Sequence, residues 1–535
     1  MRARGSATDF VPEVNQAVPE QEQSRQDVSR RDFLKAVGAG TVAAASLPSF
    51  HVIVRAQART LRILQWRHFV PPYDEWFNNV FAPRWGQRHD VRVVVDNVGL
   101  AEIPGIAAAE AARVAAGQDP GHDLIQHLSP PAAFEPQAID HADLVQELQR
   151  ATHPARPGGL GQYIPLAQKS TYNPITGKYF GISDNFVPDP IHFRADLWRR
   201  AAEQLKGFQS VHPSGPVTWH DILRAGRVLK QMGHPVGLGL SQEIDTNMWL
   251  RSLLYSWGTA IQDEEGNVIL DQPPYREKTL DALRFVRALY QEAMFPGVFA
   301  WTAASNNEEF LAGRISVAAN AISISRTAQT MALQALQRGD DPRRSPAVQM
   351  AVNTEITITA PAGPEAARGL EHVMGVYQIW NTRNTAVIDL AKRFLFDLIQ
   401  SYDPDVAAAE GWGPGKFIAS QAYDYPTFDN AIPKSKREKF LREDPIYKPI
   451  AEATGDRPNK LDRIETAFDW AHNVGWPGYS NAAIDEIFNT FVLPVMFARV
   501  AQNIDTPEQA LNQAAQEIRS IFTKWRRQRL VGGTR

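Results

Sequence analysis

Aromatic and amide side chains gather in one irregular stretch, FDWAHNVGWPGYSN, at residues 468–481. Its glycine and proline residues interrupt any regular helix or strand. Flat rings can cover the apolar C–H faces of a sugar, and amide groups can pair with its hydroxyls. Trp476 and Tyr479 are therefore candidate ligand-binding residues. The alternative is a loop that only packs onto a neighbouring lobe.

A second set of candidates follows from short runs that are typical of strands, separated by helical patterns, at residues 60–66, 90–98 and 122–129. This order predicts a parallel sheet covered by helices. Ligands of such sheets bind beyond the carboxyl ends of the strands, which singles out Trp66, Arg67, His68, Gln126 and His127. The alternatives are a core tryptophan for Trp66 and a structural histidine for His127.

The elements that must position these residues continue along the whole chain. A helix is predicted from Thr218, which forms a capping pair with Asp221. Near the C-terminus, Thr506 and Gln509 predict a capping box at the start of an amphipathic helix. Further strands are predicted within residues 353–364 and 373–380, so the α/β pattern recurs far from the first strands.

The composition of the 535-residue chain, 44% hydrophobic and 21% charged, suits a globular protein of two or more domains. A net charge of −3 supplies no basic excess for a nucleic acid partner. The absence of cysteine excludes disulfides, thiolate zinc sites and Cys-ligated iron–sulfur clusters. We therefore expect no metal and no cofactor.

An export signal is predicted at residues 29–35, SRRDFLK, which match the twin-arginine motif at every fixed position, including Arg30 and Arg31. The apolar run at 36–50 is too short to span a bilayer, and a small-residue site predicts cleavage after Ala58. One alternative is a chance arginine pair before an uncleaved helix. Another is a dinucleotide-binding turn, although no strand precedes these glycines.

Five segments between residues 179 and 399 occur in a characteristic order: YFGISDNFVPDPIHFRADLW, TWHDILRAGRVLK, LLYSWGTAIQDEEGNVILDQPPYREKTLDALRFVRALY, EEFLAGRISVAANA and GVYQIWNTRNTAVIDLAKRFLFDLI. Together they resemble the sugar-binding group of the extracellular solute-binding proteins of ABC importers, and the resemblance covers nearly the whole mature chain. The sequence departs from the family pattern at Ile182–Ser183, at residues 192–194 and at Trp257. These departures affect individual ligand contacts and not the fold.

The resemblance implies an α/β protein with the two-lobed periplasmic binding protein fold, type II-like, and a ligand cleft between lobes that close by a hinge motion. Residues 1–58 would form the leader and signal peptide. The first lobe would comprise residues 59–179 plus about 373–429, and the second lobe residues 180–372 plus about 430–535.

The resemblance also implies further ligand-binding residues beside the hinge, in cleft-side loops and after a strand of the second lobe: Asp184, Asn185, Trp301, Asn320, Ser323 and Trp412. The backbone freedom of two flanking glycines also favours Trp412. For each of these residues, capping of a turn or packing in a core is the alternative.

The function implied is that of a periplasmic substrate-binding component of an ABC importer, which binds a sugar, oligosaccharide or polyol and delivers it to the permease. The twin-arginine translocase would export it as a free monomer, because the chain has no cysteine for a lipid anchor. The sequence contains no nucleophile elbow, HExxH motif or P-loop, so we expect no enzyme. The alternatives are a periplasmic carbohydrate-active enzyme, a binding protein for a non-sugar solute and a chemoreceptor ligand carrier.

Overall fold

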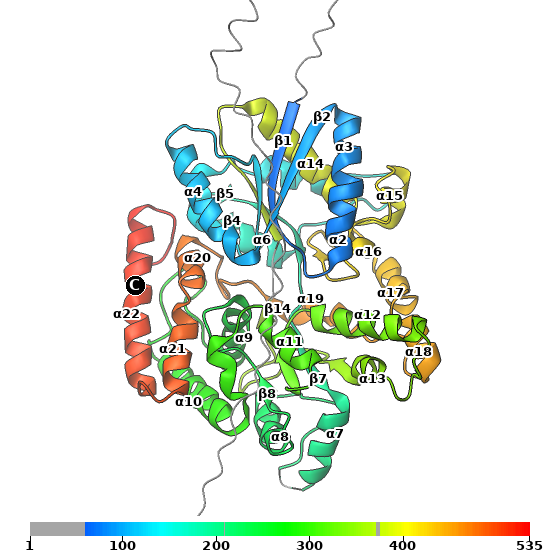
Figure 1. The fold of residues 1–535 in the computed structure, drawn as a ribbon. Helices are drawn as coiled ribbons and strands as arrows, with labels where there is room; N and C mark the ends of the chain where they lie inside the picture. Colours follow the sequence, from blue (N-terminus) through cyan, green and yellow to red (C-terminus); the bar gives the residue numbers. More distant parts are fainter. Residues whose placement is uncertain (1–58, 208, 371–374, 535) are drawn as a thin grey trace, which may run out of the picture. The chain divides into compact units, whose positions relative to one another are not determined.

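A six-stranded sheet organises the first part of the computed structural model, which describes residues 59–207, 209–370 and 375–534 (Figure 1). Its strand order is β13-β6-β12-β3-β1-β2. The strands are β1 (Arg59–Trp66), β2 (Val91–Val98), β3 (Leu124–His127), β6 (Ile182–Phe186), β12 (Gly375–Ile379) and β13 (Tyr425–Pro426). β1 pairs in parallel with both β2 and β3, which confirms the parallel pairing predicted for the first three strands.

The other strands of this sheet come from later in the chain. β12 runs antiparallel to β3 and β6, and β13 runs antiparallel to β6. The predicted lobe boundary assigns residues 180–186 to the second lobe, whereas β6 pairs with β12 inside the six-stranded sheet. The chain therefore leaves this sheet between Phe186 and Ile191.

Helices cover both faces of the six-stranded sheet, as Figure 1 shows for α3, α4 and α14. Leu61 and Ile63 of β1 and Phe394 of α14 are completely buried in the hydrophobic cluster between them. The helices are α2 (Pro71–Trp76), η1 (Phe77–Phe81), α3 (Ala82–His89), η2 (Leu100–Glu102), α4 (Ile103–Ala115), η3 (Ala132–Gln137), α5 (Ala142–Arg150), α6 (Pro165–Thr171), α14 (Thr385–Gln400), α15 (Pro404–Ala409) and α16 (Lys416–Ala419).

A four-stranded sheet with the order β10-β7-β9-β8 organises the middle of the chain. Its strands are β7 (Ile191–Arg194), β8 (Val236–Gly237), β9 (Val317–Ala319) and β10 (Thr354–Ile356). β7 is antiparallel to β9 and β10, and β8 is parallel to β9. The strand predicted within residues 353–364 is confirmed only over Thr354–Ile356, because the proline and glycine residues that follow do not continue a ladder.

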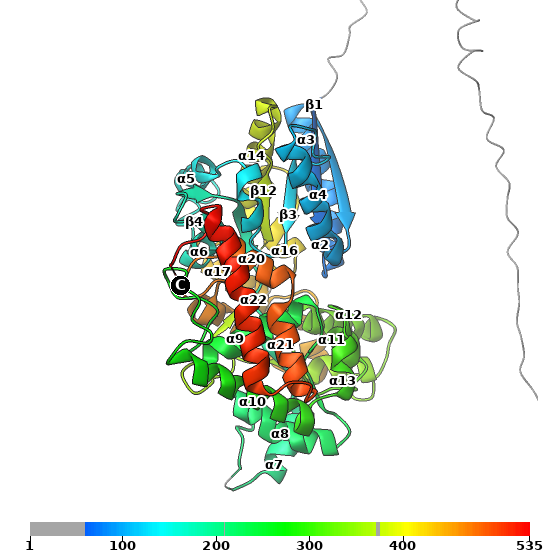
Figure 2. The same cartoon turned by 90° about the vertical axis from the view of Figure 1, so that its left-hand side faces the viewer.

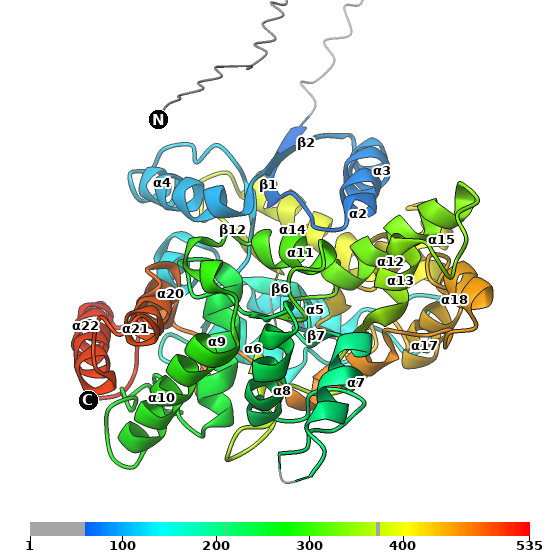
Figure 3. The ribbon, with the colours of Figure 1, turned by 60° about the horizontal axis from the view of Figure 1, so that its bottom comes forward.

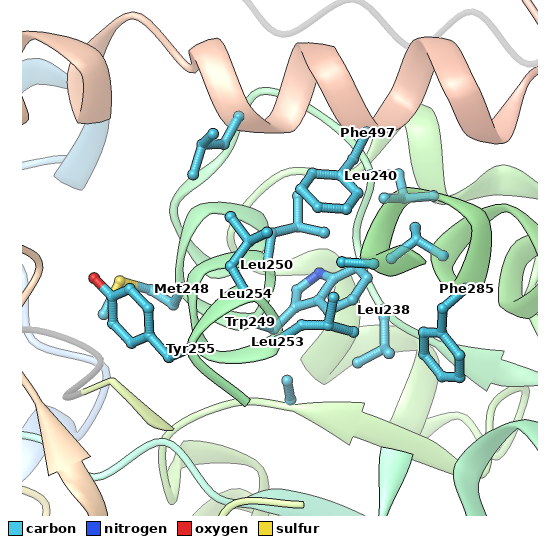
Figure 4. Close-up of a cluster of buried hydrophobic side chains, with 14 of the residues drawn as sticks. Leu238, Leu240, Met248, Trp249, Leu250, Leu253, Leu254, Tyr255, Phe285 and Phe497 are labelled. Atoms are coloured by element: carbon cyan, nitrogen blue, oxygen red, sulfur yellow. The ribbon is translucent and has the colours of Figure 1, made fainter. Parts of the chain in front are cut away.

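Helices flank this second sheet, and Figure 3 shows α7 and α8 next to β7. They are α7 (Ala195–Gln204), α8 (Trp219–Gln231), α9 (Ile244–Ser256), α10 (Tyr275–Ala293), η4 (Pro296–Ala300), α11 (Ser305–Leu311), α12 (Ser323–Gln337) and α13 (Pro346–Asn353). The predicted capping box of Thr218 and Asp221 is confirmed at the start of α8. In Figure 4, Trp249 and Leu253 of α9 pack among Leu238, Phe285 and Phe497.

Three C-terminal helices complete the hydrophobic cluster around α9, namely α20 (Ala482–Asn489), α21 (Val492–Ala501) and α22 (Pro507–Arg527). In Figure 2, α22 runs alongside both α20 and α21. The capping box predicted for Thr506 and Gln509 is confirmed at the start of α22. Its inward residues, such as Leu511 and Ile518, are fully buried.

Short elements connect these parts: β4 (Tyr172–Asn173), β5 (Lys178–Tyr179), β11 (Gly369–Leu370), α17 (Lys434–Arg442), α18 (Lys448–Thr454), η5 (Asp462–Thr466), α19 (Ala467–Trp470) and β14 (Ala471–His472). β11 pairs in parallel with β14. Among the helices of the described ranges, none combines the length and apolar character that a bilayer crossing requires. The predicted signal residues Arg30, Arg31 and Ala58 lie outside the described residues.

Candidate functional site

A completely buried lysine lies where the start of α16 reaches strand β6. The Lys416 ammonium donates a hydrogen bond to Asp184 and forms an ion pair with Asp424 at 3.3 Å. The ring centroids of Tyr73 and Tyr402 lie 5.1 and 5.4 Å from the same nitrogen. A buried charge is stable only when it is paired, and here two carboxylates and two aromatic faces surround it.

The backbone conformation of Gly415 places Lys416 at this position. Its φ of +86° lies in the left-handed region that favours glycine, and a Cβ there would lie 2.6 Å from the carbonyl oxygen of Ser401. The close approach lets the Lys416 backbone N–H donate to the Ser401 carbonyl at 2.9 Å. The glycine-rich loop therefore positions the lysine that follows it.

The two carboxylates of Lys416 differ in their protonation behaviour. Burial raises the pKa of Asp184 to about 6, against the opposing effect of the Lys416 ammonium. Burial alone would also raise the pKa of Asp424, but Lys416 and His68 hold it below its usual value. Asp424 is thus the more firmly ionised partner of the lysine.

Four of the predicted ligand-binding residues meet at this lysine and its carboxylates. Asp184 contacts Lys416 directly. The Asn185 amide donates to Asp424 at 2.8 Å, and His68 Nε2 lies 3.4 Å from the same carboxylate oxygen. The Trp66 indole stacks on the His68 ring with a centroid distance of 4.9 Å and an interplanar angle of 22°. The end of β1 and the strand β6 therefore contribute to one polar site.

A second polar cluster forms at the start of α9 and contains two more predicted residues. The Asn320 amide donates to Asn307 Oδ1 at 2.7 Å and to Asp245 at 3.4 Å, and the Ser323 hydroxyl donates to Asn320 Oδ1 at 2.7 Å. Asn306 also donates to Asp245, at 2.6 Å. These residues come from α9, α11 and the junction of β9 with α12, so the four-stranded sheet positions the cluster.

Tyr423 connects the two polar clusters. Its ring lies 4.9 Å from the His68 ring, and burial together with the carboxylates of Asp245 and Asp424 raises the pKa of its phenol well above its usual value. The neighbouring Gln421 carbonyl accepts hydrogen bonds from the Arg326 guanidinium of α12 at 2.6 and 2.9 Å. The segment before β13 therefore contacts residues positioned by both sheets.

Some buried polar atoms of this site have no hydrogen-bond partner within the described part of the chain. They are the Trp66 indole nitrogen, the Asn185 amide oxygen and the Tyr423 hydroxyl. Native proteins rarely leave such atoms unsatisfied, and a water molecule or a ligand hydroxyl can pair with each of them. The site can thus accept and donate hydrogen bonds at several points.

The predicted aromatic loop lies against α9. The Trp476 ring packs on Tyr255 at 4.8 Å, and the Arg368 guanidinium lies 4.4 Å from the Trp476 ring centroid. Tyr479 contacts the Tyr172 ring at 6.0 Å. Both predicted residues are half-buried. Ligand contact by either ring remains a prediction.

The predicted residues of β3 are buried within the six-stranded sheet. Gln126 lies opposite Tyr377 in the antiparallel register. His127 is 5% exposed, and burial lowers its pKa to about 3, so its ring stays neutral. Its nearest ring neighbour is Phe134 at 6.0 Å.

Two predicted tryptophans pack in hydrophobic cores away from the polar clusters. Trp412 makes an edge contact with Phe81 at 5.4 Å, and its carbonyl accepts a hydrogen bond from the Trp76 indole at 2.7 Å. Trp301 packs against Phe295 at 6.0 Å. The contacts of both rings correspond to the core-packing alternative.

Sequence reasoning missed Lys416, Asp424, Tyr423 and Asp245. Lys416 directly follows the glycine-rich loop, so a cation after a strained turn was a signal that could have found it. The partner Asp184 lies 232 residues earlier, a separation that no local pattern connects.

No group of three or more His, Asp or Glu side chains that could hold a metal ion occurs in the described ranges. A surface cavity of about 980 Å³ lies at the amino end of β1, away from both polar clusters. It is lined by residues that include Arg59, Arg62 and Arg383.

The fold is the two-lobed α/β fold of periplasmic binding proteins, as comparison with solved structures shows. No protein-family model matches the sequence, and no curated protein matches it either. A putative oligosaccharide periplasmic-binding protein from Synechococcus sp. MITs9220 has a TM-score of 0.60 at 14% identity, covering 87% of this chain and 100% of that chain.

Two neighbours carry ligands in their structures. Maltose-bound MalE3 from T. maritima has a TM-score of 0.58 at 16% identity and covers 87% of this chain and 100% of that chain. An ABC transporter solute-binding protein from Agrobacterium radiobacter K84, in complex with ribitol, has a TM-score of 0.57 at 16% identity and covers 87% of this chain and 99% of that chain.

Proposed function

We propose that this protein is the substrate-binding component of an ABC importer and that it binds a sugar, oligosaccharide or polyol between its two lobes. The observation that carries the proposal is the fold match along nearly the whole described chain with binding proteins whose structures hold maltose and ribitol. Polar groups positioned by both sheets, around Asp424 and Asp245, support it.

The chemistry of the site suits a polyhydroxylated ligand. The Asn185 amide oxygen offers an acceptor, and the Trp66 indole nitrogen and the Tyr423 hydroxyl offer donors, because none of these atoms has a hydrogen-bond partner among the described residues. Trp66 also contributes an aromatic ring. Sugars need this combination of flat rings and paired polar groups. Closure of the lobes would exclude water and strengthen each of these hydrogen bonds.

A binding role is favoured over a glycosidase role. A glycosidase needs two carboxyl groups that are free to exchange protons and to attack or activate water at the scissile bond. Here Asp184 and Asp424 both contact the ammonium of Lys416, which engages them in a shared buried ion cluster. This engagement favours a structural or positioning role of both carboxylates over a catalytic role.

The export signal completes the proposal. The twin-arginine motif around Arg30 and Arg31 would direct the chain to the translocase, and cleavage after Ala58 would release it. Without a cysteine for lipidation, the product would be a free monomeric periplasmic protein. It would deliver its ligand to the transmembrane subunits of the permease.

Thermal unfolding of the full chain with a panel of sugars, oligosaccharides and polyols tests this function. A bound ligand stabilises the folded state by RT ln(1 + [L]/Kd), about 2.7 kcal/mol at a hundredfold excess over Kd. We expect at least one member of the panel to raise Tm and to be recovered unchanged. Absence of any shift, or a cleavage product, would contradict the proposal.

A matched pair of variants locates the binding site. Asn320→Ala removes an amide of the polar cluster at α9 and should reduce the ligand-induced rise in Tm. Asn512→Ala removes an amide on the exposed face of α22 and should leave that rise unchanged. Equal ligand-induced shifts in both variants would place the ligand away from Asn320.

A further inference from the structure

Arg251 is a buried cation with no ion-pair partner among the described residues. It lies in the second half of α9 and is 1% exposed. None of its three guanidinium nitrogens has a hydrogen-bond partner among the described residues. Its guanidinium carbon lies 5.3 Å from the Phe488 ring centroid, and the Tyr255 phenol interacts with it electrostatically. Burial lowers its pKa to about 10, so it stays charged at neutral pH.

The Asn247 amide oxygen, a hydrogen-bond acceptor, lies on the same face of α9 as Arg251. Asn247 lies one helical turn earlier and is completely buried. Its amide nitrogen donates to the Phe488 carbonyl at 2.9 Å, whereas its amide oxygen has no partner within the described ranges. A strong donor group and a free acceptor therefore lie next to each other between α9 and α20.

The face of α9 that carries Arg251 continues to the meeting of the two sheets. Ile244, seven residues earlier on the same face, packs against the hydrophobic clusters of both sheets. The helix α20, which supplies Phe488, also reaches the six-stranded side, because Asp485 accepts a hydrogen bond from the Ala133 N–H at 2.9 Å. Arg251 thus lies about two helical turns along α9 from the residue that packs against both hydrophobic clusters.

A buried guanidinium with no partner is costly, because it loses its hydration and gains no compensating contact. Such a group requires an explanation, and an ion, a water molecule or a ligand that completes its hydrogen bonds is one. The planar donor array of arginine matches a carboxylate with two parallel hydrogen bonds. Asn247 Oδ1 in turn accepts from a hydroxyl group.

We propose that Arg251 and Asn247 form a subsite for the carboxylate and an adjacent hydroxyl of a sugar acid, so that the ligand is a polyhydroxylated carboxylate such as an aldonate or a uronate. This inference rests on the proposed function and specifies the substrate class of the same protein. A single carboxylate charge balances one guanidinium, whereas a doubly charged phosphate carries more charge than one guanidinium balances.

The test compares ligands that differ only in their terminal carboxylate. Calorimetric titration of the full chain uses D-glucuronate against D-glucose and D-gluconate against D-glucitol, at constant ionic strength in sodium chloride. We expect the acid of at least one pair to bind about 10- to 100-fold more tightly than its neutral partner, the effect of hydrogen bonds to a charged group. Glucose 6-phosphate serves as a third arm and should bind more weakly than glucuronate.

Variants assign the preference to the subsite. Arg251→Met should abolish the preference for the acid, and Arg251→Lys should keep part of it because the positive charge remains. Arg344→Met removes the same charge from a side chain that is 89% exposed and should leave the preference intact. If Arg251→Met does not fold, the Lys variant and the wild-type ligand pairs still decide the outcome.

Each outcome is decisive. Equal or tighter binding of the neutral partner overturns the sugar-acid subsite and leaves the proposed function standing. Binding of glucose 6-phosphate more tightly than glucuronate also overturns it. Acetate serves as a carboxylate without hydroxyl groups, and its binding as tightly as glucuronate would overturn the subsite as well. Failure of every neutral and acidic ligand, in these pairs and in the wider panel, contradicts the proposed function itself.

Discussion

Lys416 and Arg251 are both buried cations, yet their surroundings differ completely. Lys416 has two carboxylates and two aromatic rings around its ammonium. Arg251 lies over one aromatic ring and has no hydrogen-bond partner among the described residues. We infer from this difference that the first cation stabilises the fold around β6 and α16, whereas the second binds the carboxylate of the proposed ligand.

The largest effect is expected for Lys416→Met. The substitution leaves Asp184 and Asp424 buried without their cation, and breaking a buried ion pair in this way costs about 3–5 kcal/mol. The free energy of unfolding from urea titration measures it. A loss below about 1 kcal/mol would show that Lys416 does not hold the carboxylates together.

The two carboxylates of Lys416 should differ from each other. Asp424→Asn weakens contacts to Lys416, His68 and Asn185, so we expect a loss of about 3 kcal/mol. Asp184→Asn should cost about 1 kcal/mol, because burial already raises the pKa of this group to about 6. Urea titration of both variants compares the two losses of unfolding free energy. A larger loss for Asp184→Asn would contradict the conclusion that Asp424 is the more firmly ionised partner of Lys416.

The buried Asp485 carboxyl group has no ion-pair partner among the described residues, and it extends the comparison to the pH dependence of stability. Burial raises the pKa of Asp485 to about 7, so the folded chain holds a proton that the unfolded chain, with a pKa near 3.8, releases. Stability from this group is complete below pH 4 and is lost as the pH rises toward 7, at about 1 kcal/mol per pH unit.

Asp485→Asn isolates that dependence, because an amide oxygen can still accept from the Ala133 N–H. The difference in unfolding free energy between wild type and variant should decline from pH 4 to pH 7. A difference that is constant with pH would mean that Asp485 does not titrate in this range.

The smallest effect is expected for Arg251→Met in the absence of ligand. Replacing an uncompensated buried charge by an apolar side chain of similar length removes its desolvation cost, so we expect the free energy of unfolding to stay the same or to rise. Urea titration beside Lys416→Met gives the direct contrast. A loss as large as that of Lys416→Met would show that Arg251 has a structural partner.

Local patterns were sufficient to predict much of the fold. The strands β1 to β3 and the capping boxes of α8 and α22 follow from short-range residue spacing, and the structure contains all of them. The assignment of β6 to the six-stranded sheet was missed, because β6 pairs with strands that lie far away in the sequence. Register between such strands depends on tertiary packing, which no local signal encodes.

The site was predictable only in part. Trp66, His68, Asp184 and Asn185 meet at one ion cluster, and Asn320 and Ser323 meet at another. Lys416, Asp424 and Arg251 were missed, because a charged residue in a sequence is normally exposed and its burial becomes visible only in three dimensions. Burial distinguishes all three residues, and the lack of a hydrogen-bond partner among the described residues distinguishes Arg251 from the other two.

The most direct test of the account is an equilibrium titration of the full chain with D-glucuronate and D-glucose, followed by chemical recovery of each ligand. The account predicts saturable binding, a preference for the acid that depends on Arg251, and complete recovery of unchanged ligand. Conversion of the ligand to a product would contradict it, and so would the absence of binding by these and all other sugars, polyols and sugar acids tested.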